Sequence, residues 1–154
     1  MPRFNIATIF IFVLKQTQYK MKNQYLINAL SKGFILLSAL ALFCVSLMAF
    51  TNPQSVMDLV RTKLNNTDAF NSIRGVYGGV SATIIIALIY LLRNNVALGL
   101  AFLAILWGLY ALSRTITIFV EGGLGEFGST WLIIESILCI IALLLYTRRQ
   151  KSLN

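Results

Sequence analysis

The sequence predicts an all-α membrane protein, a bundle of four transmembrane helices, and three observations support this fold class. Hydrophobic residues make up 58% of the 154 residues and charged residues only 12%, whereas soluble domains carry about 25% charged residues. Four apolar runs each reach the roughly 17–25 residues that a helix needs to cross a bilayer core. These runs are continuous rather than alternating, which is typical of helices and not of a membrane β-barrel.

Two charges lie at membrane depth within the predicted spans. The spans are expected at about 26–50, 76–92, 96–120 and 130–146, each close to the length that a bilayer requires. The third span contains Arg114 and the fourth contains Glu135. A charge at membrane depth is costly, so it usually faces the interior of a bundle and has a partner. These two residues are the clearest indication of a site in the chain.

The distribution of the net charge of +8 predicts that both termini lie in the cytoplasm. With the N-terminus inside, that side receives most of the basic residues, namely Arg3, Lys15, Lys20, Lys22, Lys32, Arg93, Arg148, Arg149 and Lys151. The outer side receives Arg61, Lys63 and Arg74. We interpret the basic residues, including a basic tail at 148–154, as a topology signal and a contact for anionic headgroups. Nucleic acid is not an expected partner, because no basic stripe lies on a soluble domain.

Residues 1–25 form an N-terminal extension of different character. Its apolar segment, Phe4–Leu14, is too short to span a bilayer. Arg3 before it resembles the start of a signal peptide, but no small-residue cleavage site follows. Two alternatives remain: an interfacial segment on the inner leaflet, or a true start at Met21, after which the sequence leads directly into the first span. We favour the start at Met21.

The long connection between the first two spans predicts a short amphipathic helix. Asn52 and Pro53 supply an N-cap residue and a first-turn proline. Apolar residues then recur at helical spacing among charged ones as far as Leu64, which favours a helix along the outer surface. The polar run Asn65–Asp68 is expected to end this helix, and Asp68 to cap the next one.

Polar residues recur every three positions at the outer mouth of the second span. Asp68, Asn71 and Arg74 place a carboxylate, an amide and a guanidinium on one helix face. Gly75 and Gly79 form a small-xxx-small pair, which lets another helix approach closely. Helix packing is expected at Gly75, Gly78 and Gly79. On spacing alone, a capped helix start with a tight crossing is slightly favoured over a ligand site.

The pattern N-x-x-R-G-x-Y-G-G at 71–79, with Arg114 and Glu135 in later spans, resembles a known family. That family is an uncharacterised bacterial group of four-helix membrane proteins, a domain of unknown function grouped with the DoxX-like proteins. The resemblance covers roughly residues 26–147, and Ser113 stands where the family usually has Gly. It implies a multi-pass protein of the bacterial cytoplasmic (inner) membrane and no established activity.

Depth and facing predict that Arg114 and Glu135 meet. With a rise of about 1.5 Å per residue, they lie about 9 Å and about 8 Å below the outer ends of their spans. The loop Glu121–Ser129 is short and rich in Gly, so the two spans should be antiparallel neighbours. The expected pocket, in the outer half of the bundle, comprises Asp68, Asn71, Arg74, Tyr77, Tyr110, Arg114, Glu121, Trp131 and Glu135.

Two interpretations of this pair have nearly equal weight. In the first, Arg114 and Glu135 neutralise each other and lock the packing of two helices. In the second, they belong to a site for an anionic or amphipathic ligand, with arginines as anion contacts.

Residue types exclude several kinds of chemistry. The chain has no His, and Cys44 and Cys139 stand singly in different spans. Haem ligated by His, the usual zinc sites and thiol–disulfide exchange are therefore not expected, and no cofactor or metal is predicted. No nucleophile–base pair or phosphate loop is visible, so an enzyme is not predicted.

The remaining hypotheses are two. The first is a binding or accessory protein that holds a lipid, a quinone or a small amphipathic ligand, or that docks in a homo-oligomer or a larger membrane complex. The alternative is a small proton-coupled transporter that uses Glu135 as the exchangeable carboxylate.

Overall fold

The computed structural model describes residues 6–153, with side chains described at 15, 18 and 20–151. The helices are α1 (Ile6–Thr51), α2 (Pro53–Asp58), α3 (Thr67–Ile73), η1 (Arg74–Val80), α4 (Ser81–Asn94), α5 (Val96–Val120) and α6 (Glu126–Leu153). Four stretches are long and apolar enough to cross a membrane: Lys20–Thr51, Thr67–Asn94, Val96–Val120 and Glu126–Lys151. No strand occurs within residues 6–153. The predicted all-α, four-span class is confirmed.

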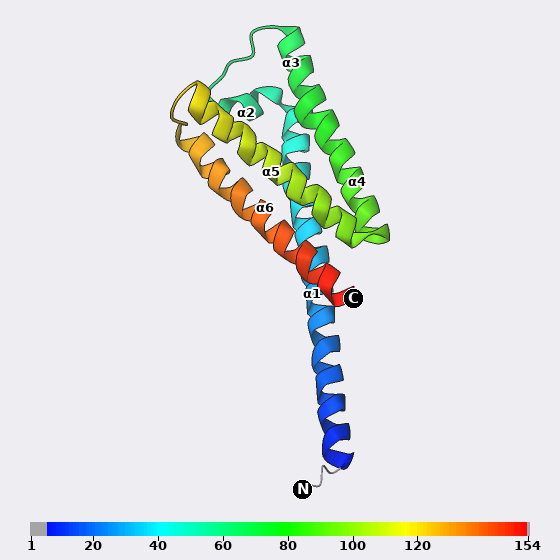
Figure 1. Ribbon diagram of the computed structural model, residues 1–154. Helices are drawn as coiled ribbons and strands as arrows, with labels where there is room; N and C mark the ends of the chain where they lie inside the picture. The colour runs from blue at the N-terminus through cyan, green and yellow to red at the C-terminus, as the bar shows by residue number, and fades with distance from the viewer. Residues whose placement is uncertain (1–5, 154) are drawn as a thin grey trace.

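The first helix is the centre of the bundle, because α2, η1, α4, α5 and α6 all pack against α1. The consecutive helices α3, η1 and α4 form one rod beside α1. α5 crosses in front of α1 in the view of Figure 1, with α6 alongside α5. α4 and α5 meet at their connection and diverge towards the opposite end of the bundle (Figure 1). That opposite end holds α2 and the α5–α6 loop, and we call it the α2 end.

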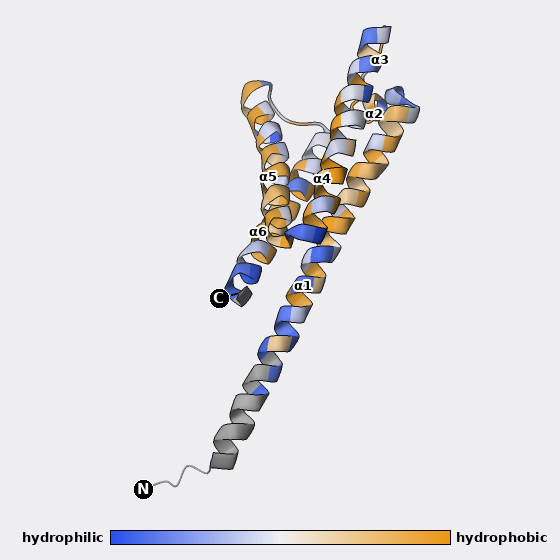
Figure 2. Ribbon diagram, turned by 90° about the vertical axis from the view of Figure 1, so that its right-hand side faces the viewer, coloured by the Kyte–Doolittle hydropathy of each residue, from blue (hydrophilic) through white to orange (hydrophobic). Residues whose placement is uncertain are grey.

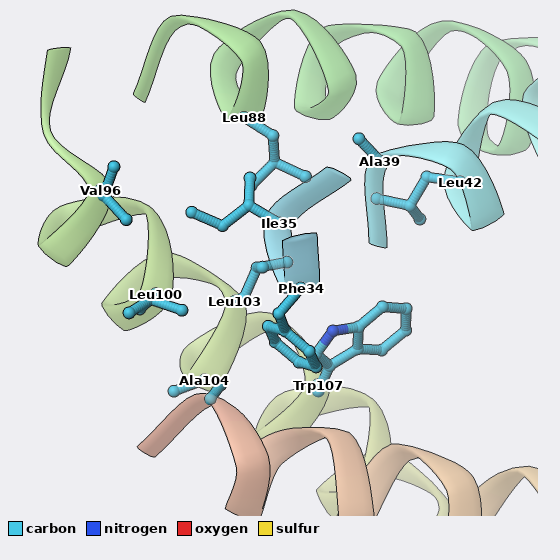
Figure 3. Packing of buried hydrophobic residues seen from close by; sticks show 11 residues of the cluster. Phe34, Ile35, Ala39, Leu42, Leu88, Val96, Leu100, Leu103, Ala104 and Trp107 are labelled. Atoms are coloured by element: carbon cyan, nitrogen blue, oxygen red, sulfur yellow. The ribbon is translucent and has the colours of Figure 1, made fainter. Parts of the chain in front are cut away.

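The core lies between α1, α4 and α5 (Figure 3). Ile35, Leu88, Leu100 and Leu103 are fully buried there, and Trp107 is the core residue of α5 nearest the α2 end. Large apolar side chains are exposed on the outward faces of all four spanning stretches. The hydrophobic colouring of the ribbon follows these stretches (Figure 2). Lipid tails are as apolar as Leu, so these faces suit a bilayer, and close packing rather than hydrophobicity holds the helices together.

The helix predicted in the first long connection forms, but it is shorter than predicted. α2 ends at Asp58, and the prediction that it reaches Leu64 is wrong. Val56 and Met57 of α2 bury against Ala49 at the end of α1. This second, smaller cluster fixes α2 to the end of the central helix.

A side chain of α2 explains why the helix stops. The amide of Gln54 donates to the carbonyl of Thr62 at 2.9 Å and accepts from the N–H of Leu64, also at 2.9 Å. These bonds hold residues 59–64 in a loop that turns back over α2. The apolar spacing of Leu59, Val60 and Leu64 therefore belongs to this loop and not to a helix.

A close approach to α1 occurs at Gly78. A Cβ atom at Gly78 would lie 3.0 Å from the ring of Phe50, and the hydroxyl of Ser46 donates to the Gly78 carbonyl at 2.9 Å. A close approach was also expected at Gly75 and Gly79, from their small-xxx-small spacing. No atom lies within 4 Å of a Cβ at either position, so no close approach occurs there. η1 is a π-helix, whose i→i+5 bonding widens the turn and changes which residues face the neighbouring helix.

Asn66, and not Asp68, caps the second spanning rod. The Asn66 side chain accepts from the N–H of Ala69 at 2.8 Å, whereas Asp68 lies in the first turn of α3. Asparagine is among the best N-cap residues because its side-chain oxygen satisfies an N–H of the first turn. The prediction that Asp68 is the cap is therefore wrong by two residues.

Replacing this cap should lower stability. We expect Asn66→Ala to reduce the free energy of unfolding by about 1 kcal/mol, because an N–H of the first turn loses its partner. The neighbouring Asn65→Ala is the matched control and should change it by no more than about 0.5 kcal/mol. Thermal unfolding followed by circular dichroism in detergent measures both, and equal losses would contradict the capping role.

The described part of the predicted N-terminal extension, residues 6–25, continues into the first span without a break. α1 begins at Ile6 and is one helix as far as Thr51 (Figure 1). Residues 1–5, which include Arg3 and the start of the apolar segment, lie outside the described residues. The start at Met21 stays a prediction.

Candidate functional site

Arg114 and Glu135 form a bidentate ion pair between α5 and α6. Nε of Arg114 donates to Oε2 of Glu135 at 2.7 Å, and Nη2 donates to Oε1 at 2.9 Å. The side chain of Glu135 is only 3% exposed, whereas that of Arg114 is 22% exposed. Charge-assisted bonds of this length and planar geometry are the strong class of hydrogen bond. It is the only ion pair among the residues that the structure describes.

The packing of α5 against α6 sets the depth of this pair. Among helix pairs in the bundle, α5 and α6 have the most extensive contact. One turn deeper than Glu135, the thiol of Cys139 donates to the carbonyl of Ala104 at 3.3 Å. Its Sγ would also lie 3.3 Å from a Cβ at Gly108. The small residue at 108 lets the two helices approach, which brings the carboxylate and the guanidinium to one level.

Arg114 lines a cavity of about 700 Å³ at the α2 end. Arginine has five N–H donors; the ion pair uses Nε and one Nη2 donor, which leaves three donors, one on Nη2 and two on Nη1, for other partners. The guanidinium carbon also lies 5.9 Å from the ring centroid of Phe127, a cation–π contact. The cavity wall consists of residues 59–61, Ser113, Arg114, Thr117, residues 124–128, Thr130 and Trp131.

A second arginine in this wall stands in an unusual backbone conformation. Arg61 has φ of 56°, in the left-handed region that favours Gly. The N–H of Arg61 donates to the Asp58 carbonyl at 3.0 Å, and the N–H of Thr62 donates to the Met57 carbonyl at 3.0 Å. This pair of bonds is a Schellman motif, in which the left-handed residue is commonly Gly. Strained conformations of this kind cluster at functional sites.

Two residues of opposite charge line the cavity without forming an ion pair. Arg61 and Glu126 both line it and are both exposed. Neither forms an ion pair with any residue in the described part of the chain. Arg114, in contrast, is already neutralised by Glu135. Together, the two arginines and the two glutamates carry no net charge. Because only Arg114 and Glu135 pair, one cation and one anion remain unpaired on the cavity wall.

Part of the predicted pocket comes together. Arg114 and Trp131 line the cavity, and Glu135 supports Arg114 from below. The ring of Trp131 lies 6.0 Å from that of Phe127, the ring that contacts the guanidinium. Phe127 and Trp131 occupy consecutive turns of α6, so both line the same cavity.

Two predicted tyrosines lie near the ion pair but outside the cavity wall. The phenol groups of Tyr77 and Tyr110 are close enough to Arg114 for electrostatic interaction. Tyr110 is 40% exposed, and its ring lies 6.1 Å from that of Trp107. Tyr77 packs against the small cluster around Met57.

The remaining predicted pocket residues do not line the cavity. Asp68, Asn71, Arg74 and Glu121 are exposed. α3 packs against η1 and α2, and none of its residues lines the cavity. Arg74 donates from Nε to the carbonyl of Phe50 at 3.4 Å instead.

Sequence reasoning missed Arg61, Phe127 and Glu126 as members of the site. Arg61 was assigned to topology alone, and no spacing rule connects a loop residue to a helix far away in the sequence. Phe127 had a detectable signal, because it lies four residues before Trp131 and so shares its helix face. No group of three Cys, Asp or Glu side chains that could hold a metal occurs among the described residues.

Comparison with protein families gives one match. A family model described as a domain of unknown function, DUF4345, matches residues 30–146. The chain belongs to the DUF4345 family. No curated protein and no solved structure matches the chain.

The DUF4345 match includes the complete site. Arg61, Arg114, Glu126 and Glu135 all fall within 30–146, and the N-terminal part of α1 falls outside it. Chemically, the site of this DUF4345 protein offers two guanidinium groups, one carboxylate without a partner and an aromatic wall. Such a combination can bind a molecule that is both charged and apolar, because polar groups fix its orientation and apolar walls supply contact area.

Proposed function

We propose that this protein is a membrane-embedded binding protein that holds an amphipathic ligand in the cavity at the α2 end. The observation that carries the proposal is Arg114, which a buried carboxylate orients and which lines a cavity of about 700 Å³. Ligand pockets usually have volumes of about 300–1,000 Å³ and are largely apolar with few polar groups. A pair that served packing alone would need no cavity beside it.

The ligand classes that suit this wall are a lipid, a quinone or another small amphipathic molecule. Phe127 and Trp131 offer flat apolar surfaces, and Arg61 and Arg114 offer donors to an anionic or carbonyl group. Binding could also serve a larger membrane complex or a homo-oligomer, in which the bound ligand would be handed to a partner. The resemblance of residues 71–79 to the DoxX-like group supports a location in a bacterial inner membrane, and the charge asymmetry supports an outward-facing α2 end.

A proton-coupled transporter is the second candidate function. Glu135 is a carboxylate at membrane depth, which this function requires. However, both of its oxygens accept from Arg114 and its side chain is 3% exposed, so access for proton exchange is poor. The geometry therefore favours binding over transport.

Filling the cavity should remove the ligand without disturbing the ion pair. Gly125 lines the cavity, and no atom lies within 4 Å of a Cβ there, so Gly125→Phe can place a ring in the cavity. Gly123→Phe is the matched control, because a Cβ at Gly123 is equally free but the residue does not line the cavity. We expect the control to retain the wild-type ligand and Gly125→Phe to lose most of it.

The measurement is mass spectrometry of small molecules that remain with each purified protein. Gel filtration confirms that both variants are folded. A folded Gly125→Phe protein that retains as much ligand as the control would refute this cavity as the binding site. A wild-type protein that retains no amphipathic molecule would refute the proposed function itself.

A further inference from the structure

The unpaired charges of the cavity indicate the kind of headgroup that it accepts. Arg61 and Glu126 line one cavity and form no ion pair with any described residue. Arg114 adds a guanidinium whose charge Glu135 already balances. A purely anionic ligand would satisfy Arg61 but would bring its charge near Glu126. A zwitterion that is neutral overall can satisfy both charges together.

The order of the charges along the bundle also matters. Glu126 begins α6 and Arg61 lies in the loop after α2, so both stand at the α2 end. Arg114 lies six residues before the end of α5, which is about 9 Å deeper at the usual helical rise. The cavity thus has one carboxylate and one guanidinium, those of Glu126 and Arg61, at its outer level and a second guanidinium, that of Arg114, deeper. A phospholipid with a terminal ammonium carries its ammonium and its phosphate a few bonds apart, so its headgroup can meet charges of both signs in one cavity.

We infer that the ligand is a zwitterionic phospholipid, whose phosphate lies between Arg61 and Arg114 and whose ammonium faces Glu126. This inference rests on the proposed function and narrows its ligand class. The phosphate accepts N–H bonds from both guanidinium groups, for which their planar donors are well suited. The ammonium donates to the Glu126 carboxylate. The rings of Phe127 and Trp131, which line the same cavity, give the lipid apolar contact beside its headgroup.

The conformation of Arg61 fits this role. A Gly would suit the left-handed position better, and an Arg there carries backbone strain of roughly 1 kcal/mol. The Arg61 side chain forms no ion pair within the described part of the chain that would offset this strain. A phosphate in the cavity supplies such a partner.

The test compares two lipids in the same bilayer. The full chain is placed in nanodiscs of equimolar phosphatidylethanolamine and phosphatidylglycerol with identical acyl chains, then extracted in detergent. Lipid that remains bound is counted by native mass spectrometry. We expect the wild type to retain phosphatidylethanolamine over phosphatidylglycerol by about two- to fivefold, the range that an exposed charge pair supports. Equal retention, or more phosphatidylglycerol, would overturn the inference.

Two variants with matched controls identify the charges. Glu126→Gln should abolish the preference between the lipids, whereas Glu121→Gln, a change to an exposed acid outside the cavity wall, should keep it. Arg61→Gly should lower retention of both lipids while the fold remains at least as stable, because Gly suits the left-handed conformation. Lys63→Gly is its control and should retain lipid. A Glu126→Gln protein with an unchanged preference would overturn the assignment of the ammonium.

Two further outcomes separate the possible failures. Soluble glycerophosphoethanolamine, which carries the same headgroup without acyl chains, should not displace the retained lipid. Displacement at micromolar concentration would identify a soluble ligand and overturn the lipid assignment. If the wild type binds another amphipathic molecule but neither lipid, the inference fails and the proposed function stands. If it binds none, both fail.

Discussion

Arg114→Met should be the most damaging single substitution at the site. It leaves the carboxylate of Glu135, whose side chain is 3% exposed, without its partner. Removing one member of a buried ion pair costs about 3–5 kcal/mol in soluble proteins, because an uncompensated charge stays behind. Glu135→Leu should cost less, since the remaining guanidinium is 22% exposed and can turn towards the cavity. The two losses of stability should differ because the side chain of Glu135 is far less exposed than that of Arg114.

The double variant Arg114→Met/Glu135→Leu should recover most of this stability. Replacing both members of a buried pair by apolar residues of similar size is often neutral or stabilising. Unfolding in mixed detergent micelles, followed by circular dichroism, gives the four free energies of the double-mutant cycle. Arg74→Met is the control, because Arg74 is exposed and has a single 3.4 Å bond, and it should cost no more than about 0.5 kcal/mol. Additive losses in the double variant would contradict the pairing.

Gly78→Leu should also destabilise the bundle strongly. A Cβ there would lie 3.0 Å from the Phe50 ring, closer than ordinary van der Waals contact, and a Leu adds further atoms to the same space. Overpacking of this kind costs about 1–3 kcal/mol. The clash also separates η1 from α1, so the 2.9 Å bond from Ser46 to the Gly78 carbonyl should be lost. Thermal unfolding of the variant measures the combined effect.

Gly79→Leu is the matched control for this substitution. No atom lies within 4 Å of a Cβ at Gly79, and Gly is a poor helix former, so the control should match or exceed wild-type stability. If Gly79→Leu lowers stability as much as Gly78→Leu does, the close approach to α1 does not occur at Gly78. If both variants match the wild type, the π-helical stretch tolerates side chains on every face.

The sequence predicted the membrane fold well because that prediction depends on length and apolar continuity. α5 matches its predicted span from Val96 to Val120. The pair of Arg114 and Glu135 was also predictable, because helical rise fixes depth and a short loop makes α5 and α6 neighbours. The argument from span length concerns one helix at a time, and the argument from depth concerns two helices that are adjacent in the sequence.

The rest of the site depends on contacts between distant segments. Arg61 reaches the cavity because Gln54 folds the loop after α2 back, and no helical periodicity describes such a loop. The polar face of α3 was recognised, but its direction depends on where α3 stands relative to α5. η1 had no detectable signal, and of the three glycines expected in helix packing Gly78 alone closely approaches α1.

The central claim is that Arg114, held by Glu135, binds a ligand in the cavity and does not serve packing alone. The most direct test is native mass spectrometry of the folded double variant Arg114→Met/Glu135→Leu beside the wild type, both extracted from the same membranes. The account predicts a specific bound amphipathic molecule in the wild type and none in the equally stable double variant. The same molecule retained by both proteins would contradict it, because Arg114 would then contribute to packing and not to binding.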